Sequence, residues 1–285
     1  MQFVKYQASG NDFLVVDKAD LPERTVVGQL AQRLCERHYG AGADGLLVIE
    51  RCQHGASADF SMLVINADGS AAEMSGNGVR CAAAYVYHEK QWAGDVVRID
   101  THAGTKSLRR LSPCGPTMMF EVEMGRPQLA SSDIPILVDR ALTPVVNYPL
   151  KLGDAVLSIT ASSMGNPHCS VIVSDLTLID VNTLGPQIEN HPVFPQRTNV
   201  EFVQVIRRDQ IEVRFWERGV GRTLSSGTGS CAAAIAAILN GLTDREVRVQ
   251  TQAGELSVRW RDDDVVVLVG PVTVVYRGEW LAPLD

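Results

Sequence analysis

Hydrophobic residues in this chain fall mainly in short runs that either alternate with polar residues or are apolar throughout, the patterns typical of β-strands. Glycine, asparagine and proline separate most of these runs. We expect strands over residues 2–8, 12–17, 46–49, 60–65, 96–101, 106–111, 117–124, 155–161, 169–174, 199–206, 210–216, 246–251, 255–260, 265–269 and 272–277.

Four segments are predicted to be helices, and they cover about residues 23–38, 77–89, 180–190 and 229–240. Strands therefore outnumber helices and follow one another in adjacent pairs. This order favours an α+β fold over alternating βαβ units. Residues 125–147 contain prolines and show no clear period, so we place the connection between two lobes there.

Two short motifs each occur twice, at nearly the same separation along the chain. Ser75-Gly76-Asn77-Gly78 recurs as Ser226-Gly227-Thr228-Gly229, and an alanine-rich segment follows each copy. Further on, Thr101-His102-Ala103-Gly104 recurs as Thr251-Gln252-Ala253-Gly254. Repeats at one offset indicate an internal duplication, so we expect two similar lobes.

Composition narrows the class of protein. A hydrophobic content of 45% with 21% charged residues is typical of a globular protein, and a net charge of −7 argues against a nucleic-acid binder. We find neither a signal peptide nor an apolar run long enough to span a membrane. The six cysteines show no spacing suited to zinc. We therefore expect a cytoplasmic protein with reduced thiols and no contact with nucleic acid or membrane.

Each glycine motif lies at the expected start of a helix. A helix N-terminus leaves about four backbone N–H groups unpaired and carries partial positive charge. Glycine there lets a carboxylate approach these groups closely. One such motif would indicate only a tight turn, but the symmetric pair predicts a binding site. Nucleophile-elbow, P-loop and dinucleotide-binding motifs do not occur, which argues against those classes of site.

Polar residues gather at expected loops beside strand ends. Asparagines in turns usually bond to their own backbone, and singly each would be structural. Together with an adjacent glutamate and arginine they suit a small zwitterion, with Arg218 holding a carboxylate and Glu217 accepting from an ammonium group. His168 follows a proline in a turn, where it could tune a neighbouring acid or base or could be structural.

Taken in order, these motifs resemble those of the diaminopimelate epimerase family. The segments that carry the resemblance are 8–13, 66–70, 75–78, 165–168, 198–202, 217–219 and 226–229. The resemblance implies two pseudo-symmetric lobes, each a mainly antiparallel sheet curled around a central helix. Residues 1–127 with 271–285 would form the first lobe and residues 128–270 the second, with the active site in the cleft between them.

The resemblance also implies a cofactor-independent epimerase that interconverts LL- and meso-2,6-diaminopimelate for lysine and peptidoglycan synthesis. It implies no pyridoxal phosphate and no metal, and it is compatible with a homodimer. The two acid/base positions would be Ser75 and Ser226. Substrate would be bound by Asn11, Asn66, Gly76, Asn77, Asn166, Asn199, Glu217, Arg218, Gly227 and Thr228, while His168 and Glu217 would adjust the acidity of the acid/base groups.

The chain departs from the family pattern at both acid/base positions. The family places a cysteine where this chain has Ser75 and Ser226, and one thiolate removes the α-proton while the opposite thiol returns it. A thiol has a pKa of about 8.5 that a helix N-terminus lowers, whereas a serine hydroxyl needs a separate base. We therefore expect substrate binding to survive better than catalysis.

Three explanations of the double serine stay open: an engineered pair of substitutions, a natural branch that uses serines, or a change to another reaction. Loss of both thiols with their surroundings kept fits the first two better than the third. The alternatives to an epimerase are therefore an isomerase or dehydratase on the same scaffold, and a catalytically silent protein that binds diaminopimelate or another amino acid.

Overall fold

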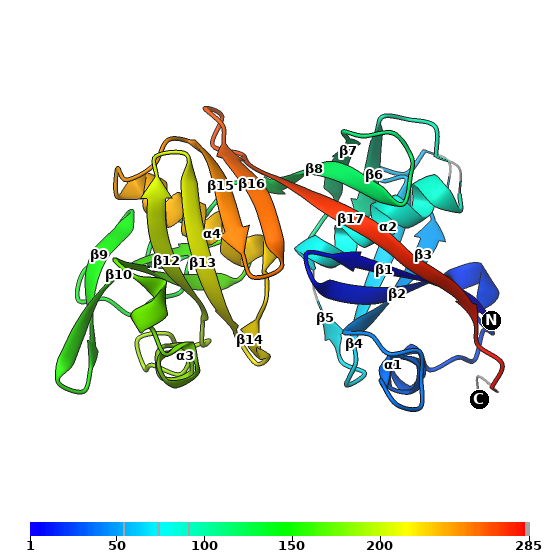
Figure 1. The fold of residues 1–285 in the computed structure, drawn as a ribbon, viewed down its shortest axis with the longest axis horizontal. Coiled ribbons are helices and arrows are strands. Elements are labelled where there is room, and N and C mark those ends of the chain that lie inside the picture. The colour runs from blue at the N-terminus through cyan, green and yellow to red at the C-terminus, as the bar shows by residue number, and fades with distance from the viewer. Residues whose placement is uncertain (54, 73–74, 91, 283–285) are drawn as a thin grey trace. The chain divides into compact units, whose positions relative to one another are not determined.

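The computed structural model describes residues 1–53, 55–72, 75–90 and 92–282. Within these residues the chain forms seventeen β-strands, four α-helices and two short 3₁₀ helices. It is therefore a mixed α and β protein in which strands predominate, as its sequence predicts. The chain divides into two compact units, of which the first contains Met1–Val122 and Gly270–Asp285 and the second contains Glu123–Val269 (Figure 1).

The first unit is a set of strands packed around one buried helix. Its strands are β1 (Gln2–Ala8), β2 (Asn11–Asp17), β3 (Gly45–Arg51), β4 (Phe60–Asn66), β5 (Ala71–Ala72), β6 (Val96–Asp100), β7 (Lys106–Arg110), most of β8 (Thr117–Gly125) and the end of β17 (Val266–Glu279). Most neighbours pair antiparallel, but β2 with β3 and β4 with β6 pair parallel. Helix α1 (Val27–Cys35) packs outside β3 and β4, and the 3₁₀ helix η1 is Lys18–Asp20.

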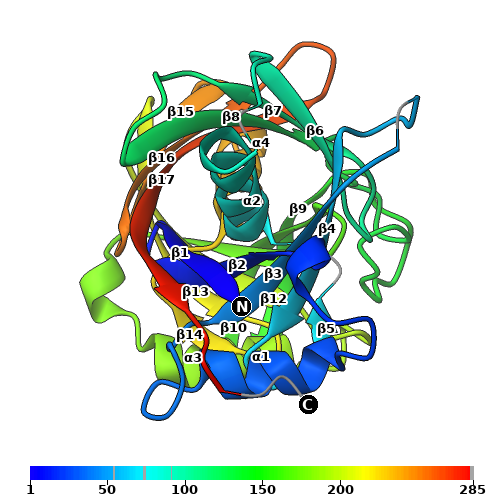
Figure 2. The ribbon, with the colours of Figure 1, turned by 90° about the vertical axis from the view of Figure 1, so that its right-hand side faces the viewer.

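Helix α2 (Gly76–His88) is the central helix of this unit. It packs against β1, β2, β3, β4, β6 and β7, and Figure 2 shows these strands around it. Every residue from Gly76 to Tyr87 is buried, so the helix is enclosed on all sides rather than amphipathic. Its three consecutive alanines, 82–84, allow the strands to approach its backbone closely.

The second unit repeats this plan. Its elements are β9 (Val145–Leu152), β10 (Ala155–Ser163), β11 (Pro167–Val173), the 3₁₀ helix η2 (Leu176–Leu178), α3 (Val181–Glu189), β12 (Asn199–Arg207), β13 (Gln210–Glu217), β14 (Gly221–Thr223), α4 (Gly227–Leu239), β15 (Glu246–Thr251) and β16 (Gly254–Trp260). Helix α4 packs against β10, β11, β12, β13, β15 and β16. Pairing is antiparallel except between β11 and β12 and between β13 and β15.

The structure differs from the predicted elements at two proline-containing stretches. The proline-containing stretch that we assigned to a connection ends in strand β9, which pairs antiparallel with β10 and buries Val145 and Leu150. The two strands predicted at 265–269 and 272–277 are one strand, β17. Pro271 lies within it, between Val269, which is the last residue paired with β16, and Thr273, which is the first residue paired with β1.

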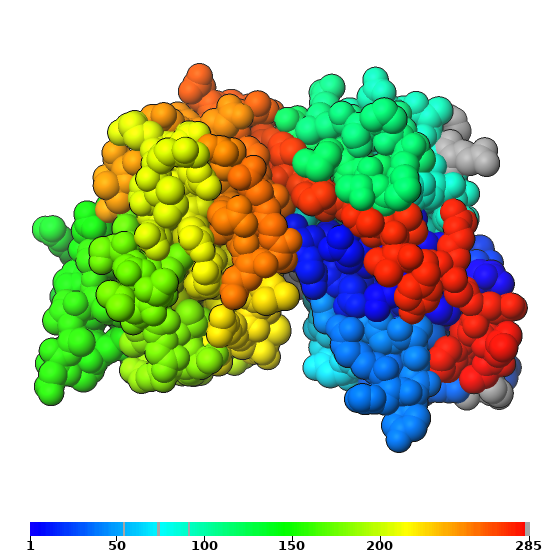
Figure 3. All heavy atoms as spheres, in the orientation of Figure 1, coloured from blue at the N-terminus to red at the C-terminus, as the bar shows by residue number. Residues whose placement is uncertain are grey.

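The end of β17 lies on the first unit beside the N-terminal strand. Gln2 is opposite Glu279 and Phe3 is opposite Gly278 in this antiparallel pair, and Figure 3 shows the last strand over the surface of this unit. A Cβ added at Gly278 would overlap the ring of Phe3. Glycine is therefore required here by the close approach of a buried aromatic ring.

No helix in the described part of the chain is both long enough and apolar enough to cross a membrane.

Replacing Gly278 with alanine should destabilise the protein. A strand interior favours alanine over glycine by about 0.5–1 kcal/mol, but displacing a packed ring costs about 1–3 kcal/mol. We expect a net loss of about 1 kcal/mol in the free energy of unfolding, measured in urea. The control is Gly115→Ala, because no atom lies within 4 Å of the Cβ that it would add. Equal stability of the two variants would contradict this account of Gly278.

Candidate active site

Ser75 caps the N-terminus of α2. Its backbone is extended and its hydroxyl oxygen accepts a hydrogen bond from the backbone N–H of Gly78 at 2.9 Å. A Cβ added at Gly78 would lie 3.0 Å from the Cβ of Ser75, so glycine permits this tight first turn. The N–H groups of Gly76 and Asn77 belong to the first turn and have no partner inside the helix. The helix start thus offers backbone donors beside a hydroxyl group.

Ser226 caps α4 in the same way but has a carboxylate partner as well. Its oxygen accepts from the N–H of Gly229 at 3.3 Å, and its hydroxyl donates to Oε2 of Glu217 at 3.0 Å. Glu217 is the last residue of β13. Burial raises the pKa of Glu217, and the hydrogen bond from Ser226 opposes that shift. An ionised Glu217 is therefore placed to accept the proton of the Ser226 hydroxyl.

His168 forms a buried pair with Glu201. The distance from its Nδ1 to Oε1 of Glu201 is 2.7 Å, and its Nε2 lies 2.9 Å from Oδ1 of Asn166. The other oxygen of Glu201 accepts from the hydroxyl of Ser170 at 3.1 Å. Contacts at both ring nitrogens hold the imidazole of His168 in one orientation.

The parallel register of β11 and β12 creates this pair. His168 is opposite Asn199 and Ser170 is opposite Glu201, and alternate residues of a strand share one face. Glu201 also lies under the start of α4, because a Cβ added at Gly229 would be 3.1 Å from its Oε1. The histidine, its carboxylate and the helix N-terminus are therefore packed together in the core of the second unit.

Asn199 joins two loops of this unit. Its Nδ2 donates to the carbonyl oxygen of Pro167 at 2.9 Å, and its Oδ1 accepts from the backbone N–H of Arg218 at 3.0 Å. The guanidinium of Arg218 donates to the carbonyl oxygen of Gln196 at 3.0 Å. Asn199 thus fixes the turn after β13 relative to the start of β11.

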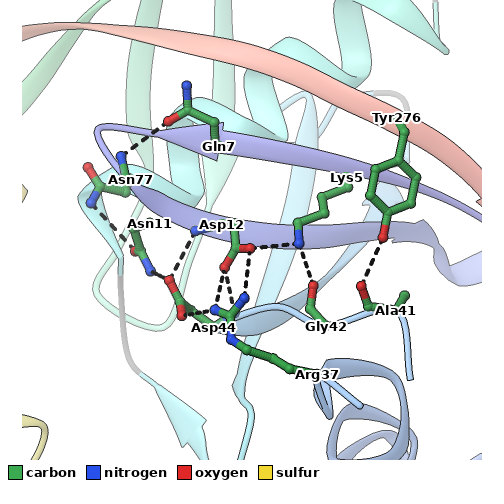
Figure 4. A network of polar contacts seen from close by, with 11 residues as sticks. Lys5, Gln7, Asn11, Asp12, Arg37, Ala41, Gly42, Asp44, Asn77 and Tyr276 are labelled. Atoms are coloured by element: carbon green, nitrogen blue, oxygen red, sulfur yellow. Dashed lines mark hydrogen bonds and ion pairs between the residues drawn. The ribbon is translucent and has the colours of Figure 1, made fainter. Parts of the chain in front are cut away.

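Asn11, Asn66 and Asn77 lie in the first unit, and Asn11 meets Asn77 at the start of α2. Asn66 closes its own turn by donating to the Ser70 hydroxyl at 3.0 Å. Asn11 donates to Asp44 at 2.6 Å, and Nδ2 of Asn77 lies 3.5 Å from Oδ1 of Asn11 (Figure 4). The start of β2 therefore meets the start of α2 through two side-chain amides.

Cys81 lies in α2 and Cys231 lies in α4, each a few residues after the capping serine. Burial raises the pKa of Cys81 to about 12, and Cys231 is also fully buried. Reactive cysteines have lowered pKa values and some exposure, so neither residue is suited to proton transfer. Among the described residues there is no group of three or more His, Cys, Asp or Glu side chains that could hold a metal ion.

The sequence is closely similar to known enzymes over its whole length. The family model for diaminopimelate epimerase matches residues 3–130 and 160–275. A diaminopimelate epimerase of Pelotomaculum thermopropionicum is 44% identical, over 98% of this chain and 99% of that protein. One of Halothermothrix orenii is 43% identical, over 98% of this chain and 97% of that protein.

This chain belongs to the diaminopimelate epimerase family. The resemblance seen in its motifs is thereby confirmed. Solved structures with the same fold include a probable proline racemase from Agrobacterium radiobacter K84, with a TM-score of 0.71 and 15% identity over 100% of this chain and 94% of that one. A Bacillus anthracis phenazine biosynthesis protein of the PhzF family has a TM-score of 0.68 and 17% identity over 99% of each chain.

Within this family member, the predicted site residues form one group in each unit. Ser75, Gly76, Asn77 and Asn11 meet at the start of α2, with Asn66 in a nearby turn. The second group is Asn166, His168, Asn199, Glu217, Arg218, Ser226, Gly227 and Thr228. Their roles toward substrate remain predictions.

Sequence reasoning missed four residues that hold these side chains: Asp44, Arg80, Ser170 and Glu201. Glu201 had a detectable signal, since it is a charged residue between valine and phenylalanine in a strand that is otherwise apolar there. Arg80 had a similar signal, since it is a charged residue in an apolar predicted helix, three positions after Asn77. Asp44 and Ser170 had none, because nothing near them in the sequence indicates which side chains they contact.

Replacing Glu201 with glutamine should remove the buried charge that faces His168. Glutamine would turn an NH₂ group toward either His168 or Ser170, and a buried hydrogen bond to a charged group contributes about 1.5–3 kcal/mol. We therefore expect the free energy of unfolding in urea to fall by about 2 kcal/mol. The matched control is Glu255→Gln, because that carboxylate is half exposed and 3.8 Å from Arg248. A loss no larger than that of the control would contradict this account of Glu201.

Glu217→Gln should reduce the pH dependence of stability. Because the pKa of Glu217 is raised above its ordinary 4.5 in the folded protein, its stabilising effect is complete below pH 4.5 and is lost as the pH rises through the folded-state value. Relative to the variant, the wild type should therefore lose stability as the pH rises from 4.5 through the raised folded-state pKa of Glu217. Urea unfolding across this range measures the difference, with surface Glu246→Gln as control. Parallel pH curves for wild type and Glu217→Gln would contradict the shift.

Proposed function

We propose that this protein is a cofactor-independent amino-acid epimerase that acts on LL- and meso-2,6-diaminopimelate, with Ser75 and Ser226 at its two acid/base positions. The observation that carries the proposal is the full-length similarity to proteins named diaminopimelate epimerase at 44% and 43% identity. Inversion at an α-carbon needs one group that removes the proton and a second that returns one on the opposite face. The two capping serines are the groups proposed for these steps.

The helix starts would bind the carboxylate next to the reacting carbon. The N–H groups of Gly76, Asn77, Gly227 and Thr228 lie in first turns, where partial positive charge favours an anion. Each helix contributes up to about 2 kcal/mol to such binding when partly buried. Asn11, Asn66, Asn166, Asn199, Glu217 and Arg218 would bind the remaining ammonium and carboxylate groups of the substrate.

The two serines are chemically unequal. Ser226 donates to Glu217, which can act as its base when ionised. Among the hydrogen bonds of the described residues, the hydroxyl of Ser75 takes part only in its capping bond to Gly78. Proton transfer at Ser226 should therefore be faster than at Ser75, and turnover by inversion should be slow.

The second candidate is a catalytically silent protein that binds diaminopimelate. The capping geometry favours this candidate over an isomerase or a dehydratase. Both hydroxyls already serve as helix caps, and serine is a far weaker acid than the cysteine of the family pattern. Binding through backbone N–H groups does not need these hydroxyls to ionise. An isomerase or dehydratase activity has only the shared fold in its support.

We also propose that the two units are pseudo-symmetric lobes that arose by duplication, with boundaries near 1–127 with 271–285 and 128–270. Their capped helices are each followed by a hairpin with the same turn. Thr101 Oγ1 donates to Gly104 O at 2.7 Å and accepts from Ala103 N at 3.2 Å. Thr251 makes the same two bonds to Gly254 and Ala253, at 2.7 and 3.2 Å. A homodimer and a cytoplasmic location remain predictions.

Incubation with LL-diaminopimelate in D₂O tests the function. Deuterium at the α-carbon together with meso product is the expected result for a working epimerase, and mass spectrometry with chiral chromatography detects both. Exchange without inversion would indicate one working base, for which Ser226 is our candidate because of its hydrogen bond to Glu217. Calorimetric binding without exchange would favour the silent binder. Absence of binding would contradict the proposal.

Restoring both thiols tests the two acid/base positions. The double variant Ser75→Cys with Ser226→Cys should increase the epimerisation rate by orders of magnitude, because a helix N-terminus lowers the pKa of a thiol. The control places cysteines at exposed Ser132 and Ser158, which lie outside the predicted site. An equal rate in wild type, control and double variant would rule out Ser75 and Ser226 as acid/base groups.

A further inference from the structure

Arg80 determines which atom of the Asn77 amide is available to a ligand. Its side chain is completely buried and turns back along α2, donating to the carbonyl oxygen of Gly76 at 3.1 Å and to Oδ1 of Asn77 at 2.7 Å. A guanidinium group has donors only, so it must face the amide oxygen. The amide nitrogen of Asn77 therefore points away from Arg80, as a hydrogen-bond donor.

Asp44 fixes the amide of Asn11 in the opposite sense, by accepting from its nitrogen. Nδ2 of Asn11 donates to Oδ2 of Asp44 at 2.6 Å, a short bond to a charged acceptor. A carboxylate only accepts, so the nitrogen of Asn11 must face it and the oxygen must point away. The remaining amide atoms face each other, since Nδ2 of Asn77 lies 3.5 Å from Oδ1 of Asn11 (Figure 4).

Asp44 needs both of its oxygens for this task. Oδ2 accepts from Asn11 and from the backbone N–H of Asp12 at 3.1 Å, while Oδ1 accepts from the Arg37 guanidinium at 2.7 Å. Asparagine at position 44 would turn its NH₂ group toward donors in either orientation. The carboxylate is therefore specifically required.

Charges around Asp12 keep Asp44 and Asn11 in place. Lys5 lies 2.7 Å from Asp12, and Arg37 bridges Asp12 and Asp44. Burial alone would raise the pKa of Asp12, but the hydrogen bonds from Lys5 and Arg37 outweigh it and the pKa is lowered. Asp12 is thus a stable anion, and its Oδ1 in turn accepts from the backbone N–H of Asp44 at 2.9 Å.

We propose that Arg80 and Asp44 are positioning residues that orient two amides, so that Asn77 offers a donor and Asn11 an acceptor to one zwitterionic ligand. The bond of 3.5 Å between the amides is long and weak, so a ligand can replace it at little cost. A carboxylate accepts from Asn77 and an ammonium donates to Asn11. This inference rests on the proposed function for the identity of the ligand, diaminopimelate.

Asp44→Asn is the direct test. We expect diaminopimelate binding, measured by calorimetry, to weaken about tenfold, with a raised KM and a smaller change in kcat if turnover is measurable. The matched control is Asp59→Asn, in the same unit. The two carboxylate oxygens of Asp59 likewise accept hydrogen bonds from a backbone N–H and from a guanidinium group. Both donors belong to Arg98, so Asp59 contacts neither asparagine. Equal weakening by both variants would indicate a general loss of stability and overturn the proposal.

Asn77→Asp tests the other amide without disturbing its contact with Arg80. Aspartate keeps an oxygen for the guanidinium but presents a second oxygen where Asn77 presents its NH₂ group. The variant should fold as stably as wild type and bind diaminopimelate at least tenfold more weakly. Unchanged affinity would show that Asn77 offers no donor to the ligand.

Side-chain NMR separates this inference from the proposed function. In ¹⁵N-labelled protein without ligand, the NH₂ signals of Asn11 should shift in Asp44→Asn and stay in place in Asp59→Asn. If wild type fails to bind diaminopimelate but the signals behave in this way, the proposed function fails and the orientation of the amides stands. If the Asn11 signals do not respond to Asp44→Asn, the inference fails whatever the protein binds.

Discussion

The start of a buried helix is the physical constraint on which this structure depends. Helices α2 and α4 are enclosed by strands, so the unpaired N–H groups of their first turns cannot all rely on bulk water. Ser75 and Ser226 satisfy one N–H each. The remaining N–H groups keep their positive potential, and a negatively charged ligand is the partner that suits them best. The backbone atoms at each helix start are therefore the ones that need a partner when the helix is buried and also the ones proposed to bind the ligand.

Serine satisfies the packing requirement and changes the chemistry. A hydroxyl caps a helix well, because its oxygen accepts from the third N–H of the first turn. For proton transfer it is inferior, since a hydroxyl stays protonated under conditions in which a thiol at a helix start is partly ionised. The fold and the helix caps are therefore compatible with serine at both positions, while the proposed proton transfer at Ser226 would depend on Glu217 as its base.

In each unit, charged side chains lie near the start of the central helix and contact polar side chains there, without having to contact a ligand. In the first unit, Arg80 and Asp44 lie at the outer ends of two asparagine amides. In the second, Glu201 holds His168 beneath α4. Buried charges are costly unless they are paired and hydrogen-bonded, and the pairing fixes the geometry of everything between them. The units therefore share a helix plan but have unlike electrostatic surroundings.

Local pattern in the sequence was sufficient for the starts of α2 and α4, most strands, the repeated motif and the family, but the first helix begins at Val27 rather than near residue 23. Capping serines, glycines and alternation of apolar residues act over a few residues, so a short segment contains the whole signal. The same reasoning missed β9, which contains Pro149 and pairs with the adjacent strand β10, and it divided β17 into two strands at Pro271, where the partner changes from β16 to β1. Proline within a run of residues argues against a strand when only the sequence is considered. Only the tertiary structure decided that His168 pairs with Glu201 and that Asp44 orients Asn11. These contacts follow from the register of neighbouring strands and from a loop that returns to β2, and the residues involved are separated by about thirty positions of sequence.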